Sequence, residues 1–307
     1  MKTRTMRSSI RDISLLFILC MVIVHLSGIF DMKERKAFLT YDSEFPIYIP
    51  ALFSSEASTG TRIKSKQKRI IAREFDWVDP QKKERKSVLH IPEDALKKEI
   101  RKFGTLFPST NPLLLKRRGF RVVGRKTYLV DRQIREKLIT IIDYKQIFER
   151  NLVYFQKLTG ELIVSAELAA ETDPLFTFLS FVQYIRYQLP PRRYKRKFIN
   201  SFFVPLVCLY EQYGDCDSKS LLLAEFLCTA PGSKEKAAMV LIKGKGLAHA
   251  LLAVKRKPLP GMTSLFDIKR GYYIVLETSS PGWSPGFVSR RVFETLKAGF
   301  FVFVELN

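Results

Sequence analysis

Hydrophobic and polar positions along the chain repeat with two different periods, and these periods predict its elements. Apolar spacing and end signals predict helices over residues 91–103, 131–158 and about 198–210, and further helices that begin at Asp173 and near Cys216. Alternating apolar residues predict strands over 121–130, 248–254 and 271–278. Helices and strands in this mixed order predict an α+β fold.

Two of the predicted strands each carry one polar side chain on an apolar face. Period two places His249 on the same face as Leu251 and Ala253. By the same period, Glu277 shares a face with Val275. If these strands pair, His249 and Glu277 are neighbours. A carboxylate in that position can orient an imidazole and stabilise its charged form.

A cysteine stands at the predicted start of a leucine-rich helix. Gly214 interrupts the preceding element, and the leucines of residues 221–227 mark the new helix. The free N–H groups and positive end of a helix stabilise a thiolate. A single Cys or His is more often structural than catalytic. Together, Cys216 as nucleophile, His249 as general base and acid, and Glu277 as orienting carboxylate fit a cysteine acyl-transfer site.

Residues 170–290 resemble the transglutaminase-like branch of the papain-type cysteine hydrolases. The resemblance is carried by Phe-Val-Gln-Tyr-Ile-Arg-Tyr at 181–187, Tyr-Gly-Asp-Cys-Asp-Ser-Lys-Ser-Leu-Leu-Leu-Ala at 213–224, Ala-His-Ala at 248–250 and Leu-Glu-Thr at 276–278. It implies a transglutaminase-like or papain-like α+β fold, with the Cys-bearing helix packed on an antiparallel sheet. It also implies the same roles for Cys216, His249 and Glu277. Relatives commonly have Asp as the third residue, so Glu277 requires a different strand spacing.

Other residues complete the predicted site. The resemblance implies an oxyanion hole that contains the backbone N–H of Cys216, with the Gln183 side chain as a candidate second donor. Trp283 either walls the substrate cleft or fills an edge of the core. Asp215 and Asp217 are expected to cap the helix rather than bind calcium. No metal and no cofactor are expected; a zinc site built on thiolates in particular is not, because the chain contains no Cys-x-x-Cys pair.

An uncharged run covers residues 13–30 and follows four basic residues in the first eleven positions. Its 18 residues are just enough for a transmembrane helix. The basic flank would stay in the cytoplasm and leave residues 31–307 on the exported, periplasmic or extracytoplasmic side of a single-pass membrane protein. A cleaved signal peptide is the alternative. The predicted fold class is therefore an α+β domain preceded by a transmembrane helix and a mixed basic region.

The charge is concentrated in the first half of the chain. Lys and Arg number 52 against 30 Asp and Glu, and residues 1–160 carry +16 of the net charge of +22. We expect an anchor over 1–30, a linker over 31–70, an accessory basic α/β region over 71–160 and a transglutaminase-like domain over 161–307. The basic residues of 64–69 belong to a solvated linker or touch anionic lipid. No nucleic-acid partner is expected, because aromatic residues do not alternate with these charges.

The sequence thus predicts an exported, membrane-anchored cysteine acyl-transfer enzyme that acts on a protein or peptide. A protease, an amidase and a protein cross-linker are all compatible, because the outcome depends on whether water or an amine reaches the acyl-enzyme. One alternative is a catalytically inactive transglutaminase-like binding module at the cell envelope. Another is an adaptor that works through the basic charge of the first half.

Overall fold

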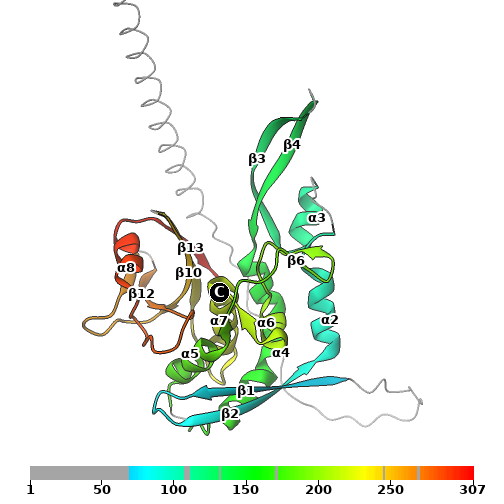
Figure 1. The fold of residues 1–307 in the computed structure, drawn as a ribbon. Helices are drawn as coiled ribbons and strands as arrows, with labels where there is room; N and C mark the ends of the chain where they lie inside the picture. The colour runs from blue at the N-terminus through cyan, green and yellow to red at the C-terminus, as the bar shows by residue number, and fades with distance from the viewer. Residues whose placement is uncertain (1–68, 107–110, 131–132, 170–171, 245, 268–269) are drawn as a thin grey trace, which may run out of the picture. The chain divides into compact units, whose positions relative to one another are not determined.

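The structure is a computed structural model that describes residues 69–307 apart from 107–110, 131–132, 170–171, 245 and 268–269 (Figure 1). The described residues belong to one unit, Ser65–Asn307. Its helices are α2 (Glu93–Lys102), α3 (Pro112–Arg117), α4 (Tyr144–Ser165), α5 (Pro174–Tyr184), α6 (Pro205–Glu211), α7 (Cys216–Thr229) and α8 (Arg290–Lys297).

The main sheet has five antiparallel strands in the order β11-β12-β10-β9-β13. These strands are β9 (Ala237–Gly244), β10 (Leu247–Lys255), β11 (Ser264–Asp267), β12 (Gly271–Leu276) and β13 (Phe301–Glu305). The other strands pair in twos: β1 (Ile70–Val78) with β2 (Glu84–Pro92), β3 (Phe120–Val130) with β4 (Gln133–Ile142), β5 (Arg186–Tyr187) with β8 (Tyr213–Gly214), and β6 (Arg193–Tyr194) with β7 (Lys197–Phe198).

The alternation along β10 divides its side chains between two layers. Leu252 and Val254 belong to the main core on the side of α7, whereas Leu251 and Ala253 belong to a second cluster with residues of α8. Figure 1 shows α7 on one side of the sheet and α8 on the other. Since successive strand residues point to opposite faces, this strand is covered by helices on both faces.

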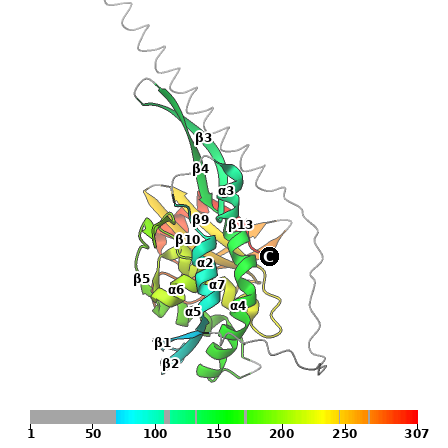
Figure 2. The same cartoon turned by 90° about the vertical axis from the view of Figure 1, so that its right-hand side faces the viewer.

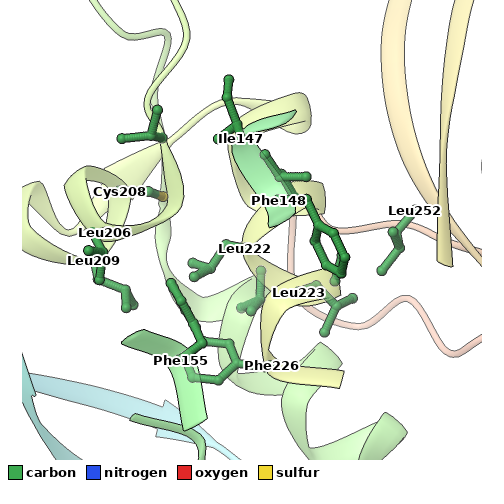
Figure 3. Close-up of a cluster of buried hydrophobic side chains, with 14 of the residues drawn as sticks. Ile147, Phe148, Phe155, Leu206, Cys208, Leu209, Leu222, Leu223, Phe226 and Leu252 are labelled. Carbon is green, nitrogen blue, oxygen red and sulfur yellow. The ribbon is translucent and has the colours of Figure 1, made fainter. Parts of the chain in front are cut away.

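The helix that begins at Cys216 is the centre of the main core. Leu222, Leu223 and Phe226 of α7 pack with Phe148 and Phe155 of α4 (Figure 3). Figure 1 places α7 between the sheet and α4, and Figure 2 shows α7 beside α4. Each fully buried side chain of this size stabilises the fold by about 1.5–3 kcal/mol relative to an exposed one. This packing fixes α7 in position and therefore fixes the residues at its start.

The predicted helix over 131–158 is wrong in its first part. Residues Gln133–Ile142 form β4, and the helix α4 starts only after Asp143, whose side chain accepts a hydrogen bond from the N–H of Gln146. Apolar residues four apart, such as Leu138 and Ile142, fit the helical period but also stand at alternate positions of a strand. Pairing with β3 decides the outcome, because it satisfies the backbone of both segments.

The predicted helix over 198–210 is shorter in the structure. It begins at Pro205, which suits a first helical turn, and the residues before it include the hairpin of β6 and β7. By contrast, α5 starts where its capping residue indicates: it follows Asp173, whose side chain accepts a hydrogen bond from the N–H of Leu175. The helix predicted over 91–103 is also present, but α2 starts only at Glu93, because Ile91 and Pro92 end strand β2.

The predicted fold class needs a correction. It includes a transmembrane helix, yet among the described residues none of the helices combines the length and the apolar character that a bilayer requires. The prediction is therefore wrong for the part of the chain that the structure describes, which is a mixed α+β fold with an antiparallel sheet. Residues 13–30, where the helix was expected, lie outside the described residues, as do the anchor and nearly all of the predicted linker.

Candidate active site

The start of α7 depends on a close approach at Gly214. A Cβ atom at this position would lie 2.8 Å from Sγ of Cys208 and 3.0 Å from Cβ of Ser218, so only glycine fits without a shift. Asp215 then caps the helix: its Oδ1 accepts hydrogen bonds from N of Ser218 at 3.3 Å and from Oγ of Ser218 at 2.6 Å. The prediction that Cys216 stands at a helix start and that Asp215 is its cap is confirmed.

Glu277 and His249 form a direct pair beside Cys216. Nε2 of His249 lies 2.7 Å from Oε2 of Glu277, and Oε1 of Glu277 accepts a hydrogen bond from N of Ser279 at 2.9 Å. The glutamate is only 4% exposed. The strands β10 and β12 pair antiparallel, which is the condition under which the sequence makes His249 and Glu277 neighbours.

The longer glutamate side chain has a structural reason. Leu252 lies opposite Leu276, so the same register continued would place His249 opposite Ser279 rather than Glu277. Glu277 follows the last residue of β12 and reaches His249 diagonally. An aspartate at the same backbone position would be one methylene shorter, so this spacing favours the glutamate.

The second nitrogen of His249 serves the thiol. Nε2 of His249 faces the carboxylate, which leaves Nδ1 as the nitrogen available to the nearby Cys216, one of the groups that raise the pKa of His249. Burial alone would lower the pKa of His249, but the hydrogen bonds and charges of Cys216 and Glu277 outweigh it and raise the pKa to about 10. Burial opposes the ionisation of Glu277, yet the hydrogen bond and charge of His249 hold its pKa below the usual value. The imidazole is therefore a cation at neutral pH.

Gln183 does not have the role that the sequence predicted. Its Nε2 donates to O of Glu277 at 2.8 Å and to O of Trp283 at 2.7 Å. Both partners are carbonyl oxygens, which only accept, so both amide protons are used. The side chain cannot donate to an oxyanion in this arrangement. It holds the backbone of Glu277 in place instead.

Lys219 is a second buried side chain that fixes the site. It lies on α7, and its Nζ donates to the backbone carbonyls of Gln183 at 3.1 Å, Ile185 at 2.7 Å and Ser279 at 3.3 Å. These contacts join the end of α5 to the segment after Glu277. Burial lowers the pKa of Lys219 to about 8, against the charges of Cys208 and Glu277, which raise it.

Two carboxyl groups flank the thiol, and one is bound by α4. Oη of Tyr144 donates to Oδ2 of Asp217 at 2.7 Å. Burial and then the charge of neighbouring Asp215 raise the pKa of Asp217 well above its usual value, because two carboxylates so close do not both ionise easily. In the residues that the structure describes, no group of three or more His, Cys, Asp or Glu side chains is placed to hold a metal ion.

Sequence reasoning missed Tyr187, whose side chain is close enough to Cys216 for the two groups to influence each other's ionisation. The apolar pattern suggested a helix through this position, but α5 ends at Tyr184, and Tyr187 lies in the short strand β5. Parallel pairing puts Tyr187 opposite Gly214, two residues before Cys216. Burial and the charges of Cys216 and Asp215 raise the pKa of Tyr187 above its usual value, so the phenol keeps its proton at neutral pH.

Trp283 contributes a backbone atom to the site. Its carbonyl accepts the hydrogen bond from Gln183, while its Nε1 donates to Oγ of Ser280 at 3.2 Å. The indole is partly exposed. The two predicted roles, a cleft wall and a core plug, both stay predictions.

Comparisons of the chain with models of protein families, with curated proteins and with solved structures found no match. The resemblance to the transglutaminase-like hydrolases therefore rests on the sequence motifs, and it stays a prediction.

Proposed function

We propose that this protein is a transglutaminase-like cysteine acyl-transfer enzyme that acts on amide bonds of a protein or peptide. The observation that carries the proposal is the 2.7 Å pair of Glu277 and His249, with Cys216 at the start of α7 close enough to raise the pKa of the imidazole. The three groups have the properties that their roles require: the carboxylate of Glu277 is fixed, the imidazole of His249 is beside it, and Cys216 is partly exposed.

The reaction uses these groups in two steps. The imidazole of His249 takes the proton of the Cys216 thiol; the resulting thiolate attacks the carbonyl carbon, and the carbonyl electron pair moves to oxygen. The tetrahedral intermediate collapses to a thioester when His249 gives its proton to the departing amine. His249 then accepts a proton from water or from a second amine, which attacks the thioester and releases the acyl group. Hydrolysis and amide exchange therefore need the same three residues.

Glu277 has a defined part in both steps. It is held at both oxygens and at its backbone carbonyl, so the imidazole that it binds has one orientation. A carboxylate fixed in this way stabilises the imidazolium without taking its proton. The proposal does not require a cofactor, because the thiol and the imidazole supply the nucleophile and the proton.

The test compares the three cysteines that the structure describes, all of which are free. Burial raises the pKa of Cys208 and of Cys228 to about 12, so these two thiols are internal controls in the same molecule. We expect iodoacetamide to label Cys216 at pH 7 at least about 100-fold faster than either control, because only Cys216 has an imidazolium beside it. Labelling of Cys216 no faster than that of Cys208 and Cys228 would contradict the proposal.

A second measurement separates an enzyme from an inactive binding module. The probe is p-nitrophenyl acetate, whose acetyl group a reactive thiol takes up with release of p-nitrophenolate. We expect the wild-type chain to release p-nitrophenolate in a burst that Cys216→Ala abolishes. Glu277→Gln should slow the burst by roughly 10²–10⁴-fold, since the imidazole loses its orienting charge. A burst that survives in Cys216→Ala would exclude this site.

A further inference from the structure

The predicted side-chain donor of the oxyanion hole is already bound to other groups, and a second candidate donor lies near Cys216. Both amide protons of Gln183 are bound to backbone carbonyls. Tyr187, by contrast, pairs with Gly214, two residues before Cys216, and burial and then the charge of the nearby Cys216 raise the pKa of its phenol. We propose that Tyr187 donates a hydrogen bond to the oxyanion that forms when Cys216 attacks a carbonyl group. This inference rests on the proposed function, because it concerns the same site.

The position of Tyr187 is fixed by the backbone around it. Tyr187 pairs with Gly214 in the parallel strands β5 and β8, and N of Gln188 donates to O of Gly214 at 3.0 Å. From the other side, Nζ of Lys219 binds the carbonyl of Ile185 at 2.7 Å. A donor held by the scaffold needs no reorganisation during the reaction, which is the condition for an effective oxyanion hole.

The chemistry requires a donor beside the sulfur and open to the substrate. The oxyanion is bonded to the carbon that the sulfur attacks, so a hydroxyl near the sulfur is also near the oxyanion. Tyr187 is 51% exposed, so its side chain is accessible to a substrate. During the attack the sulfur lone pair forms the S–C bond and the carbonyl pair moves to oxygen. Tyr187 shares its proton with that oxygen but does not transfer it.

Another role for the same residue would be a gate that blocks the thiol until a substrate displaces the ring. The two roles differ in what Tyr187→Phe does to two reactions of Cys216. Acylation by p-nitrophenyl acetate develops an oxyanion, whereas alkylation by iodoacetamide displaces iodide at a saturated carbon and develops none there. A donor affects acylation alone. A gate affects both reactions in the same direction.

The experiment measures both rates on the full chain for the wild type, Tyr187→Phe and the control Tyr184→Phe. Tyr184 ends α5 three residues earlier and is 40% exposed. We expect Tyr187→Phe to slow acylation roughly 100-fold while alkylation of Cys216 changes by less than about threefold, and Tyr184→Phe to leave both rates near the wild type. Thermal melting of each variant shows that it is folded.

Two results would overturn the inference while the proposed function stands: a rise of both rates in Tyr187→Phe, which indicates a gate, or an equal fall of both, which indicates an effect on the thiol itself. The remaining outcome is that the wild-type chain releases no p-nitrophenolate through Cys216. That result would overturn the proposed function, and the role of Tyr187 with it.

Discussion

Lys219 and Glu225 lie on the same helix and are both completely buried, yet their surroundings differ. The ammonium group of Lys219 donates to three backbone carbonyls beside the candidate site. Neither carboxyl oxygen of Glu225 accepts a hydrogen bond from any residue that the structure describes. A buried charge is costly unless it is paired or hydrogen-bonded. On α7, hydrogen bonds compensate the cost of burying Lys219, near Cys216, but none from the described residues compensates the cost of burying the carboxyl group of Glu225.

The protonation of the two side chains reflects this difference. Burial raises the pKa of Glu225 well above its usual value, and the charge of Glu99 raises it further. Glu225 thus keeps its proton where exposed glutamates have lost theirs. Lys219 has a pKa lowered to about 8 by burial and is still mainly charged at pH 7. The helix therefore carries one buried charge that organises the site and one acid that is neutralised by protonation.

The largest effect is expected from Lys219→Met, which keeps the length of the side chain but removes the donors. Three carbonyls lose their partner, and the free energy of unfolding should fall by about 2–4 kcal/mol, since each buried unpaired group costs roughly 1–3 kcal/mol and relief of the buried charge offsets part of this. Urea denaturation measures the change. Labelling of Cys216 should slow as well, because the segments that carry Tyr187 and Glu277 lose their common anchor.

Lys97→Met is the control for this change. Lys97 is exposed and pairs with Glu93 across one helical turn at 2.9 Å, so its loss should cost less than about 1 kcal/mol. If Lys219→Met were as stable as Lys97→Met, the three carbonyl contacts would not be what holds the two segments together.

Replacing Glu225 with Met should raise the free energy of unfolding, whereas Lys219→Met should lower it. In the folded protein Glu225 binds its proton more tightly than in the unfolded chain, so the wild type loses stability as pH rises from the unfolded pKa toward the raised folded value. The slope is at most about 1.4 kcal/mol per pH unit. Glu225→Met removes this proton, and its free energy of unfolding should exceed that of the wild type by a margin that grows from pH 5 to pH 7. A margin that is constant with pH would show that Glu225 is not the titrating group.

The sequence could predict the site where local signals are strong. The helix start at Cys216 follows from Gly214, the capping residue Asp215 and the leucines that come after them, all within one short segment. The strands of His249 and Glu277 follow from period two and pair antiparallel, although the register does not set the two side chains opposite each other and Glu277 reaches His249 diagonally. Each of these inferences needs only neighbouring residues or a single strand pair.

What the sequence could not predict depends on contacts between distant segments. The role of Gln183 was wrong because its partners, the carbonyls of Glu277 and Trp283, lie about a hundred positions away in the chain. Tyr187 was missed because the apolar pattern continues past the true end of α5. The apolar residues of β4 fitted both periods, and pairing with β3 decided between them.

A third, smaller loss of stability is expected from Gly214→Ala, because Gly214 lies very close to its neighbours. Gly214→Ala places a methyl group 2.8 Å from Sγ of Cys208, and overpacking of this kind typically costs about 1–3 kcal/mol. Gly160→Ala is the matched control, because a Cβ there meets nothing within 4 Å and alanine favours a helix. We expect Gly160→Ala to be neutral or stabilising in urea denaturation.

Cys208→Ala tests whether the sulfur is the obstacle. The loss of the buried sulfur alone should destabilise the protein, but it makes room for the methyl group at position 214. The double variant should therefore be more stable than the sum of the two single changes indicates. Strict additivity would mean that Ser218, the other close neighbour of Gly214, sets the limit.

The smallest effect is expected from Tyr144→Phe, which removes the hydrogen bond to Asp217 and leaves the ring in the core. Stability should fall by about 0.5–1.5 kcal/mol in urea denaturation, and the control Tyr272→Phe, at a 45% exposed position, should change it less. Tyr144 lies before residue 161, where the sequence placed the start of the catalytic domain, yet it binds the residue next to Cys216. If Tyr144→Phe also slows the labelling of Cys216, then α4 is part of the catalytic unit, whereas unchanged labelling would limit its role to packing against α7.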